Sequence, residues 1–180
     1  MNMRKLGTIE VSPIGMGCMG LSHGYGEIPD RVYSIEAIRK AHDFGCTFFD
    51  TAEAYGPNLL PENQGHNERL VGEAVHGFRR SVVLATKLHL ETAEVTAKGL
   101  ETVVRAHLAA SLERLQTDYA DLYYLHRINP DIPVEDVAQV MGKLIREGLI
   151  RGWGLSQVDV DVIERANAVT SLSAVQNIYS

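Results

Sequence analysis

Four residues with reactive side chains stand where apolar runs of the sequence end. Asp50 ends one run and Tyr55 follows it closely, while Lys87 and His126 end two later runs. Each has an ordinary explanation on its own: a turn residue, a loop-packing tyrosine, a solvated lysine and a core histidine. In parallel α/β folds, however, functional groups gather beyond the carboxyl ends of the strands. Their occurrence at equivalent places on successive runs therefore predicts a shared site.

A phenol, an ammonium, a carboxylate and an imidazole can together move a proton onto a carbonyl oxygen. Tyrosine alone is a weak acid, with an ordinary pKa of about 10, and a neighbouring ammonium stabilises the phenolate. Lys87 can supply that charge, and Asp50 can pair with Lys87 and hold it. His126 can donate a hydrogen bond to an oxygen that becomes negative. The four residue types therefore favour carbonyl reduction, with the protonation state of His126 left open.

Short apolar runs alternate with helical patterns, and these elements must position the four residues. The runs are continuous, as expected for strands that are covered on both faces. They cover residues 14–17, 46–49, 82–86, 120–125, 150–155 and 173–176. Apolar residues recur at helical spacing in segments 35–45, 67–75, 100–115, 133–148 and 159–166, and Asn67 can cap the second of these. Residues 4–11, with a turn at Gly7, predict a small hairpin.

The alternation of strands and helices predicts a parallel sheet, either a doubly wound open sheet or a (β/α) barrel. Gly15, Gly17 and Gly20 match the dinucleotide fingerprint GxGxxG, which needs a helix beginning within it. The sequence instead continues as a loop, and the next helix is expected near Arg31. We therefore favour the barrel and interpret the motif as a tight strand end that lets a ligand approach the backbone.

The composition narrows the class of protein. A chain of 180 residues is long enough for one domain with a hydrophobic core. A formal charge of −6 and a pI near 5.6 argue against a nucleic-acid partner, which usually requires a basic face. The two cysteines fit neither a disulfide framework nor a zinc site, so we expect no metal and a cytoplasmic location. No secretory signal and no run long enough for a membrane span is found, so we expect no membrane partner.

Around the four polar residues the sequence resembles the aldo-keto reductase family. Segment 49–56 is similar to the one that supplies the Asp and Tyr of the family's catalytic tetrad. Segment 85–87 resembles the one that supplies the Lys, and segment 121–126 the one that supplies the His. Segments 67–72 and 15–22 also fit, the latter resembling the bacterial and plant branch of auxin-induced-protein-like reductases.

The resemblance implies a fold and a reaction. The fold class would be α/β, a (β/α)8 TIM barrel with an N-terminal β-hairpin, of which about six of eight strands are present. Residues 1–180 would form a single domain, the N-terminal three-quarters of the barrel, truncated after the sixth strand. The reaction would be NADPH-dependent reduction of aldehydes or ketones to alcohols, with NADP+ as the oxidised cofactor. Tyr55 would be the general acid, assisted by Asp50, Lys87 and His126.

The resemblance also assigns cofactor-binding residues. Ser156, Gln157 and Gln176 would hold the nicotinamide carboxamide, and Gly17 would border the nicotinamide ribose or the substrate mouth. Gln157 replaces the usual Asn of the family, which keeps the amide but adds a methylene. An alternative for Ser156 and Gln157 is an N-cap of the following helix. Loops 21–29 and 57–66 would shape an apolar mouth through Tyr25, Leu59 and Leu60.

The expected partner is a small-molecule carbonyl substrate, and the oligomeric state is left open. Two other functions stay open beside the reductase. One is a nucleotide-binding accessory or sensor protein, similar to the β subunits of potassium channels. The other is an inactive truncated fragment, because the family segments that stack on the nicotinamide and bind the 2′-phosphate follow the sixth strand.

Overall fold

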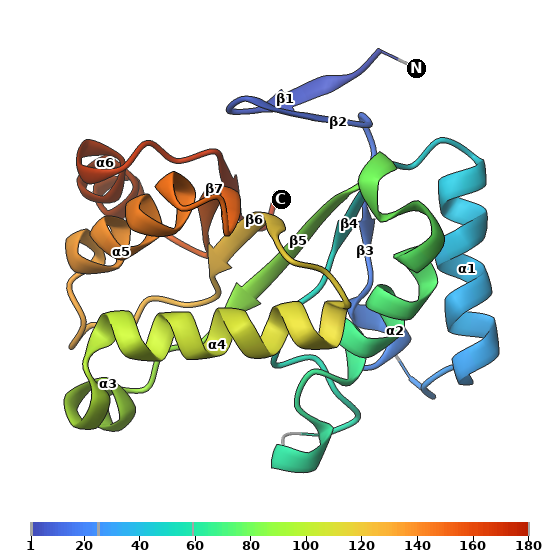
Figure 1. Cartoon of the computed structure of the whole chain (residues 1–180), viewed down its shortest axis with the longest axis horizontal. Coiled ribbons are helices and arrows are strands. Elements are labelled where there is room, and N and C mark those ends of the chain that lie inside the picture. The colour runs from blue at the N-terminus through green and yellow to red at the C-terminus, as the bar shows by residue number, and fades with distance from the viewer. Residues whose placement is uncertain (1, 25, 59, 180) are drawn as a thin grey trace.

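The computed structural model of the protein describes residues 2–24, 26–58 and 60–179 (Figure 1). Tyr25 and Leu59, which we expected to shape a substrate mouth, lie outside the described residues. The larger sheet has six parallel strands that pair in chain order. They are β3 (Met16–Gly17), β4 (Phe48–Asp50), β5 (Val83–Leu88), β6 (Ala120–Leu125), β7 (Ile150–Ser156) and β8 (Ala174–Gln176).

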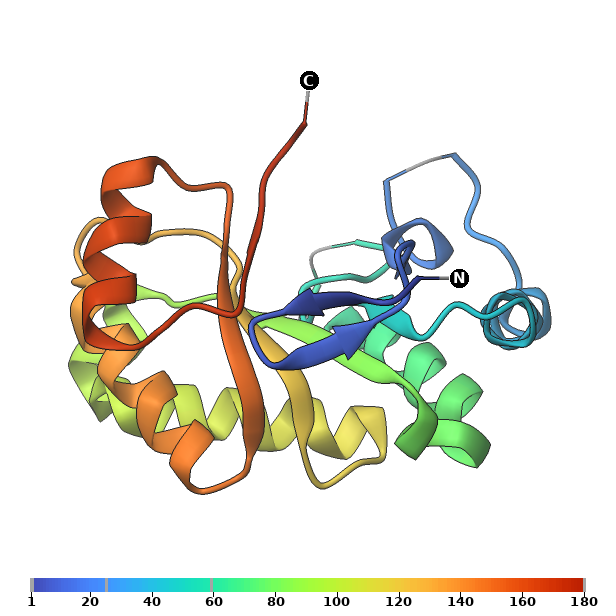
Figure 2. The same cartoon turned by 90° about the horizontal axis from the view of Figure 1, so that it is seen from above.

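Helices follow the strands and cover one face of this sheet. Seen from above, the strands form an arc that is open on one side, with the helices on its convex side (Figure 2). The α-helices are α1 (Arg31–Asp43), α2 (His66–Val75), α3 (Thr92–Lys98), α4 (Leu100–Leu115), α5 (Val134–Arg146) and α6 (Val160–Val169). Three short 3-10 helices, η1 (Met19–Leu21), η2 (Pro61–Asn63) and η3 (His76–Ser81), complete the connections.

A two-stranded antiparallel hairpin precedes the sheet and lies across the amino ends of its strands (Figures 1 and 2). Its strands are β1 (Arg4–Leu6) and β2 (Ile9–Val11), joined by a turn in which Gly7 has a φ of +59°. Ile9 and Val11 are buried and pack against residues of the concave face. The hairpin itself confirms the prediction from the sequence, and the structure shows that it closes the amino end of the arc.

Side chains on each strand alternate between the concave face and the helix layer. The concave face is an apolar cluster that includes Phe48, Val83, Ala85, Leu122, Tyr124 and Ala174. The intervening residues of the same strands, such as Leu84, Leu88 and Leu125, belong to the two clusters under the helices. Two positions beyond the last concave residue of β4, β5, β6 and β8 stand Asp50, Lys87, His126 and Gln176. Strand alternation thus places all four at the edge of the concave face formed by the carboxyl ends of the strands. We call this edge the rim.

The glycine motif does not open a long helix. The chain leaves β3 through the single turn of η1, and α1 begins only at Arg31, where the Asp30 side chain accepts a hydrogen bond from the Tyr33 N–H at 3.0 Å. The geometry at the helix start that a dinucleotide fingerprint requires is therefore missing from the described residues of this segment. The choice of a barrel over a doubly wound sheet rests on this feature.

A separate helix, α3, was not expected from the sequence. It has no buried residue, so it lacks the apolar stripe by which helices are recognised. It ends at Gly99, whose φ of +83° allows the chain to turn directly into α4. In the described part of the chain, no helix has the length and apolar character needed to cross a membrane.

Candidate active site

Lys87 is the centre of the site. Its side chain is fully buried on β5, and its ammonium contacts oxygen atoms of three residues. Nζ donates to Asp50 Oδ1 at 2.5 Å, to the Thr51 carbonyl at 2.7 Å and to the Tyr55 hydroxyl at 3.2 Å. These three contacts use the whole donor capacity of an ammonium group. The alternative of a solvated lysine is therefore wrong.

Asp50 stands at the end of β4 and connects the two sides of the rim. Its Oδ1 accepts from Lys87, and its Oδ2 accepts from the Gln176 amide at 3.2 Å, although Gln176 is 126 positions away in the chain. A buried carboxylate is stable only when it is paired and hydrogen-bonded, and Asp50 meets both conditions. The carboxylate therefore fixes Lys87 rather than capping a turn.

Tyr55 and His126 meet on the open side of Lys87. Their rings are 5.6 Å apart between centroids, at 83°, in an edge-to-face arrangement. The Lys87 ammonium lies 4.9 Å from the centroid of the Tyr55 ring. Tyr55 is only partly buried, so its hydroxyl combines a cationic neighbour with access from outside. The structure thus brings Asp50, Tyr55, Lys87 and His126 together, while their catalytic roles stay predictions.

The charge of His126 follows from its surroundings. Burial lowers the pKa of His126 to about 4, and the nearby positive charges of Lys87, Arg127 and His89 act in the same direction. The imidazole is therefore neutral near pH 7. A neutral imidazole keeps one N–H donor, which is what a hydrogen bond to a carbonyl oxygen requires.

The predicted cofactor residues lie along the same rim. Ser156 and Gln176 are aligned in the β7–β8 register, and Gly17 is aligned with Asp50 in the β3–β4 register. A Cβ added at Gly17 would meet no atom within 4 Å, so the space above this residue is open. Gln157 is exposed, has a left-handed φ of +57°, and donates its N–H to the Gln176 carbonyl at 3.1 Å. Roles in cofactor binding remain predictions for all four residues.

The alternative that Ser156 and Gln157 cap the next helix is wrong. α6 begins at Val160 and its N-cap is Asp159. Ser156 is buried, and its hydroxyl instead accepts from Arg127 Nη1 at 3.2 Å. The same nitrogen of Arg127 donates to the His126 carbonyl at 2.6 Å. Arg127 thus connects two predicted site residues, and it was not itself predicted from the sequence.

Asn67 is a second residue whose role differs from the prediction. α2 begins one residue earlier, at His66, after Gly65 with a left-handed φ of +69°. The buried Asn67 side chain accepts from the Thr51 hydroxyl at 2.6 Å and donates to the Cys18 carbonyl and the Ser22 hydroxyl, each at 2.8 Å. It therefore joins the segment after β4 to the segment after β3, instead of capping a helix.

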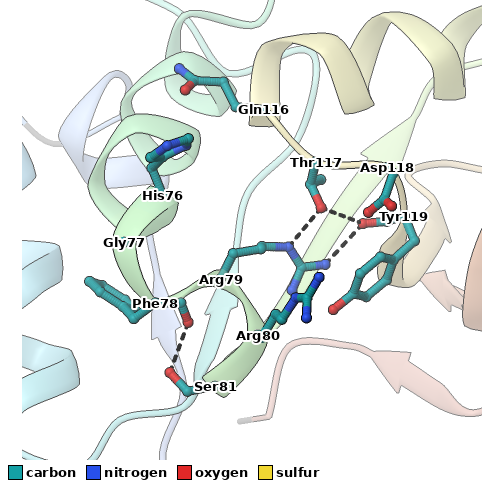
Figure 3. Close-up of a pocket in the computed structure, with 10 residues that line it drawn as sticks. All are labelled: His76, Gly77, Phe78, Arg79, Arg80, Ser81, Gln116, Thr117, Asp118 and Tyr119. Atoms are coloured by element: carbon teal, nitrogen blue, oxygen red, sulfur yellow. Dashed lines mark hydrogen bonds between the residues drawn. The ribbon is translucent and has the colours of Figure 1, made fainter.

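One cavity lies away from the rim, near the amino ends of β5 and β6. It has a volume of about 800 Å³ and is lined by residues of η3 and of the turn between α4 and β6 (Figure 3). Arg79 crosses its wall and donates to Thr117 Oγ1 and to the Val82 and Tyr119 carbonyls. Within residues 2–24, 26–58 and 60–179, no group of three or more His, Cys, Asp and Glu side chains is arranged to hold a metal ion.

Comparison with known proteins gives the family. Residues 13–180 match the model of the aldo/keto reductase family. The probable aldo-keto reductase 1 of Glycine max is 38% identical over 96% of this chain and 49% of its own length. The aldo-keto reductase yakc [NADP(+)] of Schizosaccharomyces pombe is 37% identical over 98% of this chain and 52% of its own length. The chain thus spans about half the length of these two relatives.

A solved structure agrees with this result. The holo form of the aldo-keto reductase AKR11C1 from Bacillus halodurans is 32% identical, with a TM-score of 0.82 over 100% of this chain and 58% of that one. The likeness confirms the predicted fold class, a TIM-barrel type of α/β fold in which a hairpin precedes six parallel strands. The chain belongs to the aldo/keto reductase family.

Proposed function

We propose that the protein reduces the carbonyl group of small aldehydes or ketones to an alcohol, with NADPH as the cofactor. The observation that carries the proposal is the buried Lys87 ammonium, which bonds the Asp50 carboxylate and the Tyr55 hydroxyl at once. A phenol held against a fixed cation is suited to donate a proton and to keep the negative charge that remains.

The rim offers the kinds of group that a nicotinamide end requires. The nicotinamide carboxamide is a neutral group that both donates and accepts hydrogen bonds. Ser156 can meet it with a hydroxyl, and Gln157 and Gln176 with amides. Gly17 leaves open space beside them. Bound NADPH would supply a hydride to the carbonyl carbon. The name of the Schizosaccharomyces pombe relative includes NADP(+), which supports a preference for the phosphorylated dinucleotide.

In the proposed reaction, Tyr55 donates its hydroxyl proton to the carbonyl oxygen. Lys87 stabilises the phenolate because its ammonium lies 3.2 Å from the phenolic oxygen. Asp50 and the Thr51 carbonyl hold the ammonium from the opposite side, so that little reorganisation is needed when charge develops. General-acid catalysis of this kind contributes about 10²- to 10⁴-fold to a rate.

His126 would orient the substrate as a neutral hydrogen-bond donor. Its pKa of about 4 means that it carries no charge at neutral pH. A neutral imidazole still has one N–H to donate to the carbonyl oxygen, which suits an orienting role. The proton then comes from Tyr55, and His126 directs the oxygen toward it.

The test compares the protein with Tyr55→Phe, which removes one hydroxyl and keeps the ring. We expect aldehyde-dependent oxidation of NADPH by the protein, and a loss of about 10²- to 10⁴-fold in Tyr55→Phe with unchanged cofactor binding. Normal turnover in Tyr55→Phe would contradict the proposed role. Tight NADPH binding without turnover over a broad aldehyde panel would instead favour the nucleotide-sensing function.

We also propose a cytoplasmic location, on the basis of cysteine usage.

A further inference from the structure

A histidine outside the proposed tetrad bridges two carboxylates. His107, on α4, has its Nδ1 at 2.9 Å from both carboxylate oxygens of Glu53 and its Nε2 at 3.2 Å from Glu94 Oε2. Glu53 belongs to the segment after β4, and Glu94 lies on α3. The Glu53 side chain is 2% exposed and the His107 side chain 18%. One ring therefore joins three elements of the fold.

The geometry favours an imidazolium at His107, because both ring nitrogens face carboxylate oxygens. A neutral imidazole has one N–H donor, so its other nitrogen would present a lone pair to a carboxylate. Only the protonated ring donates to both Glu53 and Glu94. The hydrogen bond with Glu53, first of all, raises the pKa of His107 to about 9, and Glu94 adds to this effect. His107 and His126 thus have pKa values shifted in opposite directions.

Glu53 connects this bridge to the proposed site. It precedes Tyr55 by two positions, and its Oε1 accepts from the His89 N–H at 2.7 Å just beyond the end of β5. Its backbone carbonyl accepts from the Gly65 N–H at 2.7 Å. The Tyr55 N–H in turn bonds the Ala52 carbonyl at 3.1 Å, within the same tight turn. A displacement of Glu53 would therefore displace the Tyr55 hydroxyl.

We propose that His107 is a positioning residue for carbonyl reduction: as an imidazolium it bridges Glu53 and Glu94 and so fixes the turn that carries Tyr55. This inference rests on the proposed function. A misplacement of about 1 Å at a reacting group costs about 100-fold in rate, so a bridge remote from the reacting atoms can control turnover. Loss of the His107 proton would leave two carboxylates facing one neutral ring.

Other titratable groups surround the bridge but do not replace it. A hollow of about 470 Å³, lined by the two carboxylates and His107, opens beside the ring. Glu94 also accepts from Lys98 at 3.0 Å, and the His89 ring lies 3.1 Å from Glu91. Arg114 lines a second, smaller hollow together with His107 and pairs with Glu68. The Tyr123 hydroxyl is buried near Glu53. Glu53 itself has His107 as its cationic partner among the described ion pairs.

The test uses a neutral and a permanently charged replacement of His107. We expect kcat for aldehyde reduction near pH 7 to fall about 10- to 100-fold in His107→Gln, with KM little changed. We expect His107→Arg to keep most of kcat, because a guanidinium donates to two carboxylates and stays charged. The ratio of wild-type kcat to that of His107→Arg should fall about fivefold between pH 8 and pH 10 as the imidazolium is lost.

Two outcomes separate this proposal from the proposed function. An inactive wild-type protein overturns the reduction itself, and with it the role of His107. An active protein whose kcat is the same in His107→Gln overturns only the positioning role. Nitrogen NMR of the wild-type protein at neutral pH checks the bridge without any variant. We expect protons on both ring nitrogens of His107, and a single protonated nitrogen would contradict the proposal.

Discussion

The two ends of the sheet each hold a buried carboxylate beside a cation, but they use it differently. At the carboxyl ends of the strands, Asp50 binds Lys87, whose third contact is the partly exposed Tyr55 hydroxyl. At the amino ends, Asp121 lies 2.8 Å from Arg79 and 2.9 Å from Arg151. It also accepts from the Leu84 N–H at 2.9 Å. The Asp50–Lys87 pair is extended by the Tyr55 hydroxyl, whereas Asp121 is extended by the Leu84 backbone N–H.

The cluster at the amino ends, formed by Asp121, Arg79, Arg151 and Tyr119, is suited to stabilise the fold. Both guanidinium groups lie over the Tyr119 ring, with Arg79 at 4.2 Å and Arg151 at 4.4 Å from the ring centroid. Figure 3 shows Arg79 reaching Thr117 and Tyr119 across the cavity wall. Function gathers at the carboxyl end of such barrels, and groups at the amino end serve the fold. The comparison therefore predicts that the rim controls rate and the opposite end controls stability.

The largest expected effect is on rate, at the rim. In Lys87→Met the phenolate loses its cation, and we expect kcat/KM for aldehyde reduction to fall about 10³-fold or more. Steady-state kinetics checks this, with Lys143→Met, an exposed lysine on α5, as the control that keeps normal activity. If Lys87→Met kept more than a tenth of the activity, the rim would not be the reacting centre.

The next effect is on stability, at the amino end. Asp121→Asn leaves Arg79 buried without its carboxylate, and we expect the free energy of unfolding to fall by about 3 kcal/mol. Urea unfolding measures this. Asp118→Asn, at an exposed carboxylate that lines the same cavity, should change it by less than about 0.5 kcal/mol. Equal effects of the two changes would contradict the structural role of Asp121.

A smaller effect concerns the pH dependence of stability at the rim. His126 has a folded pKa of about 4, below the value of about 6.5 in the unfolded chain. Between these values the unfolded chain binds the additional proton, so stability falls as the pH falls through this window. From pH 7 to pH 5 we expect the wild type to lose about 1–2 kcal/mol more than His126→Asn. Parallel losses would show that burial does not keep this imidazole neutral.

The smallest effect tests the open space at the rim. Gly17→Ala should leave the free energy of unfolding within about 0.5 kcal/mol, because its Cβ meets nothing within 4 Å. If the nicotinamide end of NADPH approaches here, the dissociation constant should rise about tenfold, as titration of cofactor fluorescence would reveal. Gly15→Ala is the matched opposite, since its Cβ would lie 2.6 Å from Phe48 Cδ1 and should destabilise the fold. Unchanged NADPH affinity in Gly17→Ala would remove this residue from the cofactor site.

The sequence predicted the rim well because parallel strands carry its residues to one edge. The bounds of β6 match the apolar run at residues 120–125, and Lys87 and His126 follow the concave alternation of their strands. By contrast, α3 was missed because it buries no residue and so has no periodic signal. Local pattern is informative only where burial repeats along the chain.

Local sequence patterns could not predict the roles of residues whose partners lie far away in the chain. His107 lies in segment 100–115, which was predicted as a helix from its recurring apolar residues, but its partner Glu53 is 54 positions away. Asn67 was interpreted as a helix cap, whereas its partners Cys18 and Ser22 lie 49 and 45 positions away. A polar residue on an inward helix face, together with a buried carboxylate near a predicted site, is the signal that points to such bridges.

The central claim is that a carbonyl substrate bound at the rim receives a hydride from NADPH on its carbon and a proton from Tyr55 on its oxygen. The direct measurement supplies NADPH deuterated at the transferring carbon of the nicotinamide, together with an aromatic aldehyde, and analyses the alcohol by mass spectrometry. The account predicts one deuterium on the carbinol carbon with the wild type and almost none with Tyr55→Phe over the same time. Alcohol without deuterium, or equal labelling by both proteins, would contradict it.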